Sequence, residues 1–224
     1  CADVTGVQTC ALPILVFLDI TATNEARNTT VAMVEKVSKS VFIPFTVGGG
    51  IKSIEEINTL LKAGADKIAI NSAGVKNPEL LENASKYFGS QCVVAAIDAK
   101  FVDNDYFVFI NAGKKNTGVK LVDWAKTVEK AGVGEILLTS MDTDGTQNGF
   151  DLKMTKTVTE NVNIPVIASG GAGANAEHFK DVFEKSGADA ALAASIFHFN
   201  TLPIKVLKEE LYKSNICIRR KNDW

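Results

Sequence analysis

Short apolar runs alternate along the chain with longer segments of helical periodicity. Such runs, bounded by glycine, proline or aspartate, are typical of strands buried on both faces, and their alternation with helices predicts a parallel sheet built from βα units. The strands that we expect are Leu15–Ile20, Ile43–Val47, Lys67–Ile70, Cys92–Asp98, Glu135–Ser140, Ile164–Ser169 and Asp189–Ala193. The pattern therefore predicts an α/β fold of the (β/α)8 TIM-barrel type, with seven strands where a closed barrel has eight.

Local signals refine this outline. Ser53-Ile54-Glu55-Glu56 is a capping box, and Asn77-Pro78 puts proline at the first position of a helix. Tyr106–Ile110 is expected as an additional strand on the loop after Asp98, with Lys100–Asp103 as its hairpin partner.

The sequence also repeats itself. The segment 43–50 (IPFTVGGG) corresponds to 164–171 (IPVIASGG), and a Gly-Ala-Asp triplet follows each, ending at Asp66 and at Asp189. A further short strand comes after each triplet. We therefore expect two half-barrel repeats.

Glycines follow one strand in each repeat, at Gly48, Gly49 and Gly50 and at Gly170, Gly171 and Gly173. Glycines between a strand and a helix expose backbone amides, and the helix terminus adds partial positive charge, so such a loop binds phosphate without a lysine. One cluster alone is equally well a tight turn. Two in repeated positions, each beside a second loop (Asn71-Ser72 and Ala194-Ser195), favour a substrate with a phosphate at each end.

Acidic residues stand at strand ends. Asp98 ends its strand, where barrel side chains point into the catalytic mouth, and flanking phosphates would raise its pKa, as suits a group that both gives and takes a proton. Asp19, Asp142 and Asp144 occupy similar positions but are also typical loop caps or turn acids. The segment 114–118 (KKNTG) is either a solvated turn, which its composition favours, or a loop that closes over an anion. His178 and His198 are interpreted as surface or packing residues.

Composition narrows the function classes. The 224 residues, 46% of them hydrophobic, suffice for one barrel domain, and a net charge of −2 without a basic cluster beyond residues 219–221 argues against nucleic-acid or membrane partners. The four cysteines have no metal-binding spacing, which predicts neither a metal site nor a disulfide framework. No apolar run could span a bilayer and no signal peptide opens the chain, so we expect a cytoplasmic protein.

Six motifs together resemble the cyclase subunit of imidazole glycerol phosphate synthase. They are LVFLDIT (15–21), FTVGGGI (45–51), AIDAK (96–100), KKNTG (114–118), SMDTDGT (140–146) and SGGAG (169–173). The resemblance, which runs from Leu15 to the C-terminus, implies that ammonia from a glutaminase partner attacks the ribulosyl carbonyl of a bisphosphorylated aminoimidazole carboxamide ribotide. Imidazole glycerol phosphate and the carboxamide ribotide would be the products, with no cofactor and no metal.

The same resemblance implies roles for individual residues. Asp98 would be one of two acid/base aspartates, Lys67 and Glu135 half of a charged ammonia gate, and Asp66 part of the glutaminase interface. The residues expected to bind substrate phosphate are Gly49, Gly50, Asn71 and Ser72 on one side and Asp144, Gly145, Gly170, Gly171, Ala194 and Ser195 on the other. Those expected to support the active site are Asp19, Lys100, Thr139 and Ser169.

The front of the chain departs from the family pattern. Only 16 positions separate Asp3 from Asp19, too few for a strand, a crossover helix and a second strand, and 4–14 match a translated sequencing-adapter frame. We therefore expect 1–14 to be non-native, 15–224 to form one incomplete barrel without its first βα unit and second acid/base aspartate, and the chain itself to be inactive. The alternatives are the sister phosphoribosyl isomerase, or a catalytically dead phosphate-binding and glutaminase-docking module.

Overall fold

The computed structural model describes residues 14–18 and 31–218; Asp3, Asp19 and most of the segment 1–14 lie outside these ranges. The strands are β1 (Leu15–Leu18), β2 (Phe45–Gly48), β3 (Lys67–Ile70), β4 (Val93–Val102), β5 (Asp105–Ile110), β6 (Lys115–Lys120), β7 (Glu135–Ser140), β8 (Val166–Ser169) and β9 (Ala190–Leu192). The helices are α2 (Val31–Ser38), α3 (Ile54–Lys62), α4 (Ser72–Lys76), α5 (Pro78–Phe88), α6 (Leu121–Lys130), α7 (Leu152–Thr159), α8 (Ala176–Ser186), α9 (Ser195–His198) and α10 (Ile204–Lys213), with a 3-10 turn at Ser90–Cys92.

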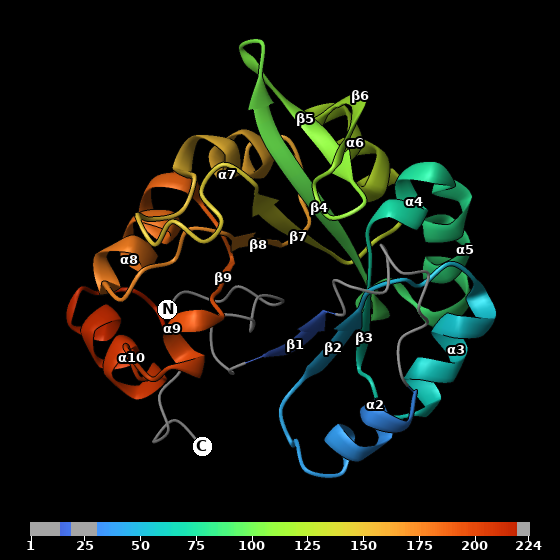
Figure 1. The fold of residues 1–224 in the computed structure, drawn as a ribbon, viewed down its shortest axis with the longest axis horizontal. Helices are drawn as coiled ribbons and strands as arrows, with labels where there is room; N and C mark the ends of the chain where they lie inside the picture. The colour runs from blue at the N-terminus through green and yellow to red at the C-terminus, as the bar shows by residue number, and fades with distance from the viewer. Residues whose placement is uncertain (1–13, 19–30, 219–224) are drawn as a thin grey trace.

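The sheet has the parallel order β1-β2-β3-β4-β7-β8-β9, and the helices lie outside its curve (Figure 1). The seven predicted parallel strands are all present, so the α/β barrel-type fold is confirmed. β3 and β7 have the predicted ends, whereas β2 and β8 begin after Pro44 and Pro165. Proline has no N–H to give to a ladder, so each stands just before its strand and contributes only its carbonyl.

The repeat predicted from the sequence is present as a repeated set of hydrogen bonds. The Pro44 carbonyl accepts from the Leu15 N–H and the Pro165 carbonyl from the Ile136 N–H, both at 2.9 Å. The next residue in each case, Phe45 or Val166, donates its N–H to the carboxylate of the Gly-Ala-Asp triplet, at 2.8 Å to Asp66 and 2.9 Å to Asp189. The backbone N–H of each aspartate in turn donates to the carbonyl of that residue, at 2.9 Å from Asp66 to Phe45 and 3.0 Å from Asp189 to Val166. The two triplets therefore anchor the starts of β2 and β8 in the same way.

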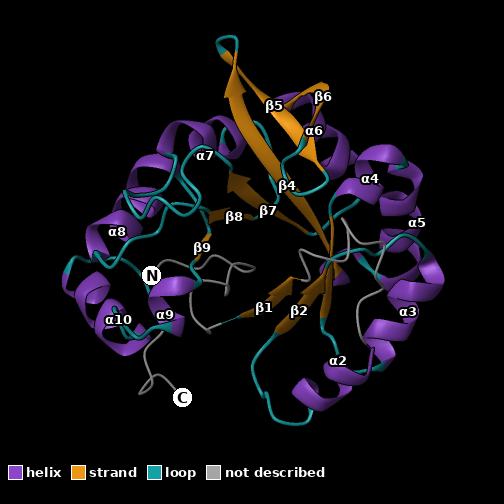
Figure 2. Cartoon of the chain, in the orientation of Figure 1, coloured by secondary structure: helices purple, strands orange, loops and turns teal. Residues whose placement is uncertain are grey.

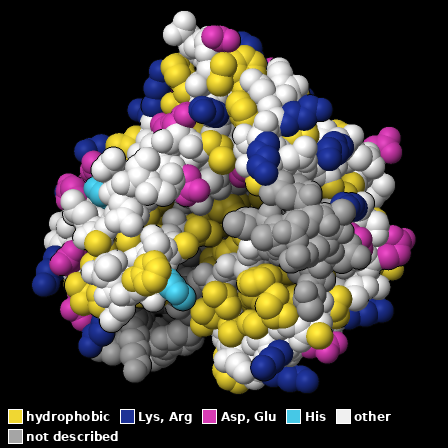
Figure 3. Space-filling model, in the orientation of Figure 1, with side chains coloured by type: hydrophobic (Ala, Val, Ile, Leu, Met, Phe, Trp, Pro, Cys, Tyr) yellow, Lys and Arg dark blue, Asp and Glu magenta, His cyan; other side chains and the backbone are white. Residues whose placement is uncertain are grey.

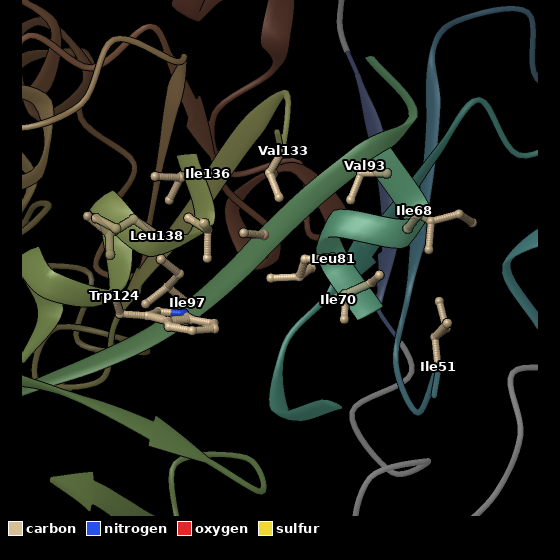
Figure 4. Close-up of a cluster of buried hydrophobic side chains, with 14 of the residues drawn as sticks. Ile51, Ile68, Ile70, Leu81, Val93, Ile97, Trp124, Val133, Ile136 and Leu138 are labelled. Carbon is tan, nitrogen blue, oxygen red and sulfur yellow. The ribbon is translucent and has the colours of Figure 1, made fainter. Parts of the chain in front are cut away.

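Alternation along the strands divides the core into two sides. Val93, Ala95 and Ile97 of β4 face the helices and belong to a large cluster that includes Ile68 and Trp124 (Figure 4). Val94 and Ala96 face the other way, into a smaller cluster with Ala69 and Leu137. Since side chains alternate across a strand, Asp98 continues the second side and points into the barrel interior.

We predicted that the fourth strand ends at Asp98, but β4 is longer. It runs on to Val102 and turns through Asp103 and Asn104, both with positive φ, into β5, which confirms the expected hairpin. The segment 114–118 was interpreted as a solvated turn or a closing loop. Lys114 does lie in a turn, but residues 115–118 begin β6, which pairs antiparallel with β5 (Figure 2). Its side chains are largely exposed, but they belong to a three-stranded extension of the sheet.

Helix starts agree largely with the sequence signals. The Ser53 hydroxyl accepts from the Glu56 N–H at 3.3 Å, and Pro78 opens α5. The Glu56 carboxylate accepts a hydrogen bond from the Lys52 N–H. In a capping box the donor would be the N–H of Ser53, one residue later. None of the helices in the described ranges is long and apolar enough to cross a bilayer.

Candidate active site

Three polar side chains form a row across the mouth of the barrel. The register pairs Asp98 of β4 with Thr139 of β7, and Thr139 with Ser169 of β8. Paired residues of neighbouring parallel strands point to the same face, so all three face the interior at the carboxyl ends of their strands. Lys100 lies on the same face two positions further along β4, exposed to solvent.

Asp98 is the acidic group of this row. Burial raises the pKa of its carboxyl because the ionised form loses hydration, and the negative charge of Asp144 raises it further. The Asn71 amide opposes both effects by donating a hydrogen bond to Asp98 Oδ2 at 2.9 Å. A carboxyl with a raised pKa and one fixed donor suits a group that exchanges protons with a ligand.

Asn71 connects this acid to the first glycine loop, Gly48–Gly50. Its Nδ2 is used by Asp98, whereas its Oδ1 is buried without a hydrogen-bond partner among the described residues. A buried acceptor without a partner is costly, so this oxygen is suited to a donor on a ligand. The sequence assigned Asn71 to phosphate binding; the structure adds a direct contact with the acid.

The first glycine loop opens onto a pocket of about 350 Å³. Gly49 and Gly50 have φ of 110° and 68°, the region that glycine adopts without strain. The pocket is lined by Gly49, Gly50, Ile51, Lys52, Ala69, Asn71, Ser72, Ala73, Lys76 and Asn111. The predicted residues of the first side are therefore brought together around one cavity.

Asn111 is a lining residue that the sequence did not predict. It lies in the turn between β5 and β6, and its backbone N–H donates to Ser72 Oγ at 3.0 Å. Because that oxygen already accepts a bond, the hydroxyl proton of Ser72 is free to point at a ligand. Asn111 lies 39 positions from Ser72 along the chain, and no pattern in the sequence relates the two residues.

The second glycine loop, Gly170–Gly173, is packed against the loop between β7 and α7. Gly171 accepts from the Gly149 N–H at 2.8 Å, and Gly170 accepts from Thr143 Oγ1 at 3.2 Å. A Cβ at Gly171 would come within 2.1 Å of the Gly149 carbonyl oxygen, so these glycines are required by packing as well as by any ligand. The Gly173 N–H donates to His178 Nδ1, so it is not the free amide that the sequence suggested.

The other residues predicted for the second side lie on neighbouring loops. Asp144 and Gly145 are exposed in the loop after β7, and a Cβ at Gly145 would meet no atom within 4 Å. Ala194 and Ser195 follow β9 at the start of α9. Their neighbour Ala193 packs against the same hydrophobic cluster as Ala172 of the second glycine loop. Asp142 has a local role: it accepts from the Phe101 N–H at 2.7 Å.

At the opposite, amino-terminal end of the strands, Lys67 and Glu135 form an ion pair. They lie on β3 and β7, on either side of β4, and face the interior because their partners in the register, Thr46 and Val94, do. Both side chains are mostly buried, at 18% and 11% exposure. Asp66 is exposed nearby, where it also anchors β2.

Lys114, Lys115 and Lys120 are exposed in β6 or beside its start. Figure 3 shows basic side chains gathered over the upper part of the molecule, where β5 and β6 lie in Figure 1. Hydrophobic side chains gather instead over β1 and β2, where Leu15 and Leu18 are partly exposed. Among the described residues, no three metal-ligating side chains lie close enough to hold an ion.

Comparison with known proteins gives the family. Residues 6–203 match the family described as histidine biosynthesis protein. A protein of Hydrogenobaculum sp. (strain Y04AAS1) is 53% identical over 206 residues, and one of Clostridium botulinum (strain Kyoto / Type A2) is 55% identical over 207; each alignment covers 92% of this chain and 81% of the relative. Both relatives are named imidazole glycerol phosphate synthase subunit HisF, as is a protein of Bacillus cereus (strain Q1) that is 53% identical over 206 residues.

Proposed function

This chain belongs to the histidine biosynthesis protein family, and from that premise we propose that the protein acts as the cyclase subunit of imidazole glycerol phosphate synthase. The inactivity expected of these 224 residues by themselves stays a prediction, which turnover by this chain would contradict. In the proposed reaction, ammonia and a bisphosphorylated ribulosyl aminoimidazole carboxamide ribotide yield imidazole glycerol phosphate, aminoimidazole carboxamide ribotide and water, the water carrying away the oxygen of the attacked carbonyl. The enzyme would be a carbon–nitrogen lyase of the cytoplasm. The names of the relatives favour this activity over that of the sister isomerase.

The observation that carries the proposal is a desolvated carboxyl between two glycine loops. Asp98 lies in the row with Thr139 and Ser169, and its pKa is raised by burial. A substrate with a phosphate at each loop would cross this row, so that its reacting carbons lie beside Asp98. Proximity of this kind supplies a large part of enzymatic rate enhancement.

We assign proton transfer to Asp98 in its two forms. Ionised, it accepts a proton from the ammonia adduct or the closing ring; protonated, it donates to the leaving oxygen or nitrogen. Asn71 holds Oδ2 in place by its hydrogen bond, which leaves the other oxygen of Asp98 toward the substrate.

The two phosphates would be bound mainly by backbone. On the first side we assign them to Gly49, Gly50, Asn71 and Ser72, around the pocket of about 350 Å³. On the second side we assign them to Asp144, Gly145, Gly170, Gly171, Ala194 and Ser195. Exposed lysines near β5 and β6 would attract the anionic substrate to the mouth.

The relatives are named as subunits of a synthase, which implies a second subunit. We propose that it is a glutaminase that docks at the amino-terminal end of the strands. The Lys67–Glu135 pair lies at that end of the interior, where it would control the entry of ammonia. Asp66 would contact the partner. This assignment predicts that Lys67→Met changes glutamine-dependent turnover more than turnover with added ammonium salt.

The test measures binding and turnover separately. Calorimetry with the bisphosphorylated substrate reports binding, and absorbance or chromatography reports imidazole glycerol phosphate formed with ammonium salt. Turnover that is lost in Asp98→Asn supports the cyclase. Binding without any turnover would favour the phosphate-binding and docking module, and turnover of the isomerase substrate instead would overturn the proposal.

A further inference from the structure

His178 lies in the first turn of α8, yet its side chain turns back toward the second glycine loop. Its Nδ1 accepts a hydrogen bond from the Gly173 N–H at 3.2 Å. The imidazole is half-buried rather than free in solvent. In this contact the ring acts as an acceptor for the loop.

The same ring lies between two loops. A Cβ at Gly173 would be 2.9 Å from His178 Cε1, and one at Gly149 would be 3.6 Å from His178 Cδ2. Gly173 belongs to the loop after β8, whereas Gly149 belongs to the loop after β7. A side chain at Gly173 would clash with the imidazole, whereas a Cβ at Gly149 would lie in ordinary contact with it, so the ring packs beside both loops.

These loops are also joined directly. The Gly149 N–H donates to the Gly171 carbonyl, and Thr143 Oγ1 donates to the Gly170 carbonyl. Across a trans peptide the carbonyl and the following N–H point in opposite directions. With the Gly170 carbonyl turned toward Thr143, the Gly171 N–H is directed away from that loop, as a phosphate donor must be.

We propose that His178 is a positioning residue of the second phosphate site. The imidazole accepts a hydrogen bond from Gly173, in the same loop as Gly170 and Gly171, and packs beside Gly149, which donates to the Gly171 carbonyl. Through these two contacts it holds the backbone of Gly170 and Gly171 in place before the ligand arrives. Donors fixed in advance bind more tightly because less ordering remains to be done on binding. The inference rests on the proposed function, since it needs a phosphate at this loop.

Two substitutions separate the acceptor from the ring. His178→Phe keeps a ring beside Gly149 but removes the acceptor, whereas His178→Asn removes the ring but keeps an oxygen near the position of Nδ1. We expect His178→Phe to weaken binding of the bisphosphorylated substrate on the order of tenfold, and His178→Asn to stay within about threefold of the parent chain. His198→Ala, which removes the exposed imidazole of α9, is the control for loss of a histidine.

Calorimetry gives the dissociation constants, and the Gly173 amide signal in NMR reports the hydrogen bond directly. The proposal requires that this signal shifts in His178→Phe and is largely restored in His178→Asn, in parallel with affinity. Equal affinity in all variants, or a lower melting temperature without weaker binding, would overturn it. So would normal affinity in His178→Phe with weak binding in His178→Asn. If the parent chain itself does not bind the substrate, the proposed function fails and not this inference alone.

Discussion

At the scale of single residues, the surroundings of Asp98 have opposing effects on its ionised form. Burial and the charge of Asp144 make its ionised form costly, and Asn71 recovers only part of that cost. A buried carboxyl of this kind is expected to destabilise the fold in which it lies.

Asp98→Asn is therefore expected to lower turnover and to raise stability. Loss of an acid/base group costs about 10²- to 10⁴-fold in kcat, whereas substrate affinity should change little because the phosphates supply most of it. Because the pKa of Asp98 is higher in the folded than in the unfolded chain, ionisation favours unfolding. This effect is fully present above the folded pKa and vanishes below the unfolded value of about 4.

Thermal melts of the parent chain and Asp98→Asn at a series of pH values test the sign. The variant should melt higher at neutral pH, and the difference should shrink as the solution is acidified. A variant with near-normal turnover would contradict the catalytic assignment, and one that melts lower at neutral pH would contradict the effect of burial.

Gly50 gives a second prediction at this scale. Its φ is 68°, and it lines the first pocket. Gly50→Leu should raise the KM for the bisphosphorylated substrate by roughly tenfold or more, because the new side chain enters the space assigned to phosphate. Kinetics with varied substrate would measure the effect.

Gly187 provides the matched control, since its φ is also 68° and it ends α8 away from the pocket. Gly187→Leu carries the same backbone strain, and a Cβ there would make only ordinary contacts with Thr159. Equal KM values in the two variants would show that strain, and not the pocket, is responsible.

At the scale of elements, the hairpin of β4 and β5 is tied to the loop that carries Asp144. Tyr106 of β5 donates its hydroxyl to the Asp151 carboxylate, 3.2 and 3.3 Å from the two oxygens. Asp151 also caps α7 by accepting from the Met154 N–H at 2.9 Å. Burial raises the pKa of Tyr106, so it remains a donor throughout the physiological range.

Tyr106→Phe should cost about 1 kcal/mol of unfolding free energy, because it leaves the half-buried Asp151 with one donor fewer. Urea titration followed by circular dichroism would measure it. Tyr87→Phe is the control, since Tyr87 is 73% exposed. Equal effects of the two substitutions would show that the Tyr106–Asp151 contact contributes nothing specific.

The observed strands also show which sequence signals were sufficient to predict where a strand begins and ends. Buried strands such as Lys67–Ile70 and Glu135–Ser140 were predicted to the residue because an unbroken apolar run has clear ends. β6 was missed because its residues are polar and include Gly118, so only pairing with β5 makes it a strand. The predicted end of β4 was wrong because the strand continues beyond Asp98 into the hairpin with β5.

At the scale of the whole molecule, the sequence predicted the repeat and the barrel-type sheet but not the contacts between distant loops. Asn111 with Ser72, and His178 with Gly173 and Gly149, join segments whose spacing carries no pattern. Asp66 was related to a partner interface from resemblance alone; its bond to Phe45 gives it a structural role as well.

The repeat makes a prediction about stability. Asp66→Ala and Asp189→Ala each remove the carboxylate that accepts from the first residue of a strand, at β2 and β8. Each should cost about 1 kcal/mol, and the double variant should cost their sum because the two carboxylates accept from different strands, at Phe45 of β2 and Val166 of β8. Denaturant titration of both single variants and the double variant tests this. A large departure from additivity would contradict the independence of the two sites.

The core around Trp124 has a practical consequence. This indole is 5% exposed in α6 and packs in the cluster that contains Ile97, the neighbour of Asp98 (Figure 4). The chain's other tryptophan, Trp224, lies outside the described residues. Indole emission shifts to the red when water reaches the ring. Trp124 therefore reports on the packing of the helix-facing side of β4, the strand that carries Asp98. Fluorescence should therefore register loosening of the strand that carries Asp98 without any attached dye.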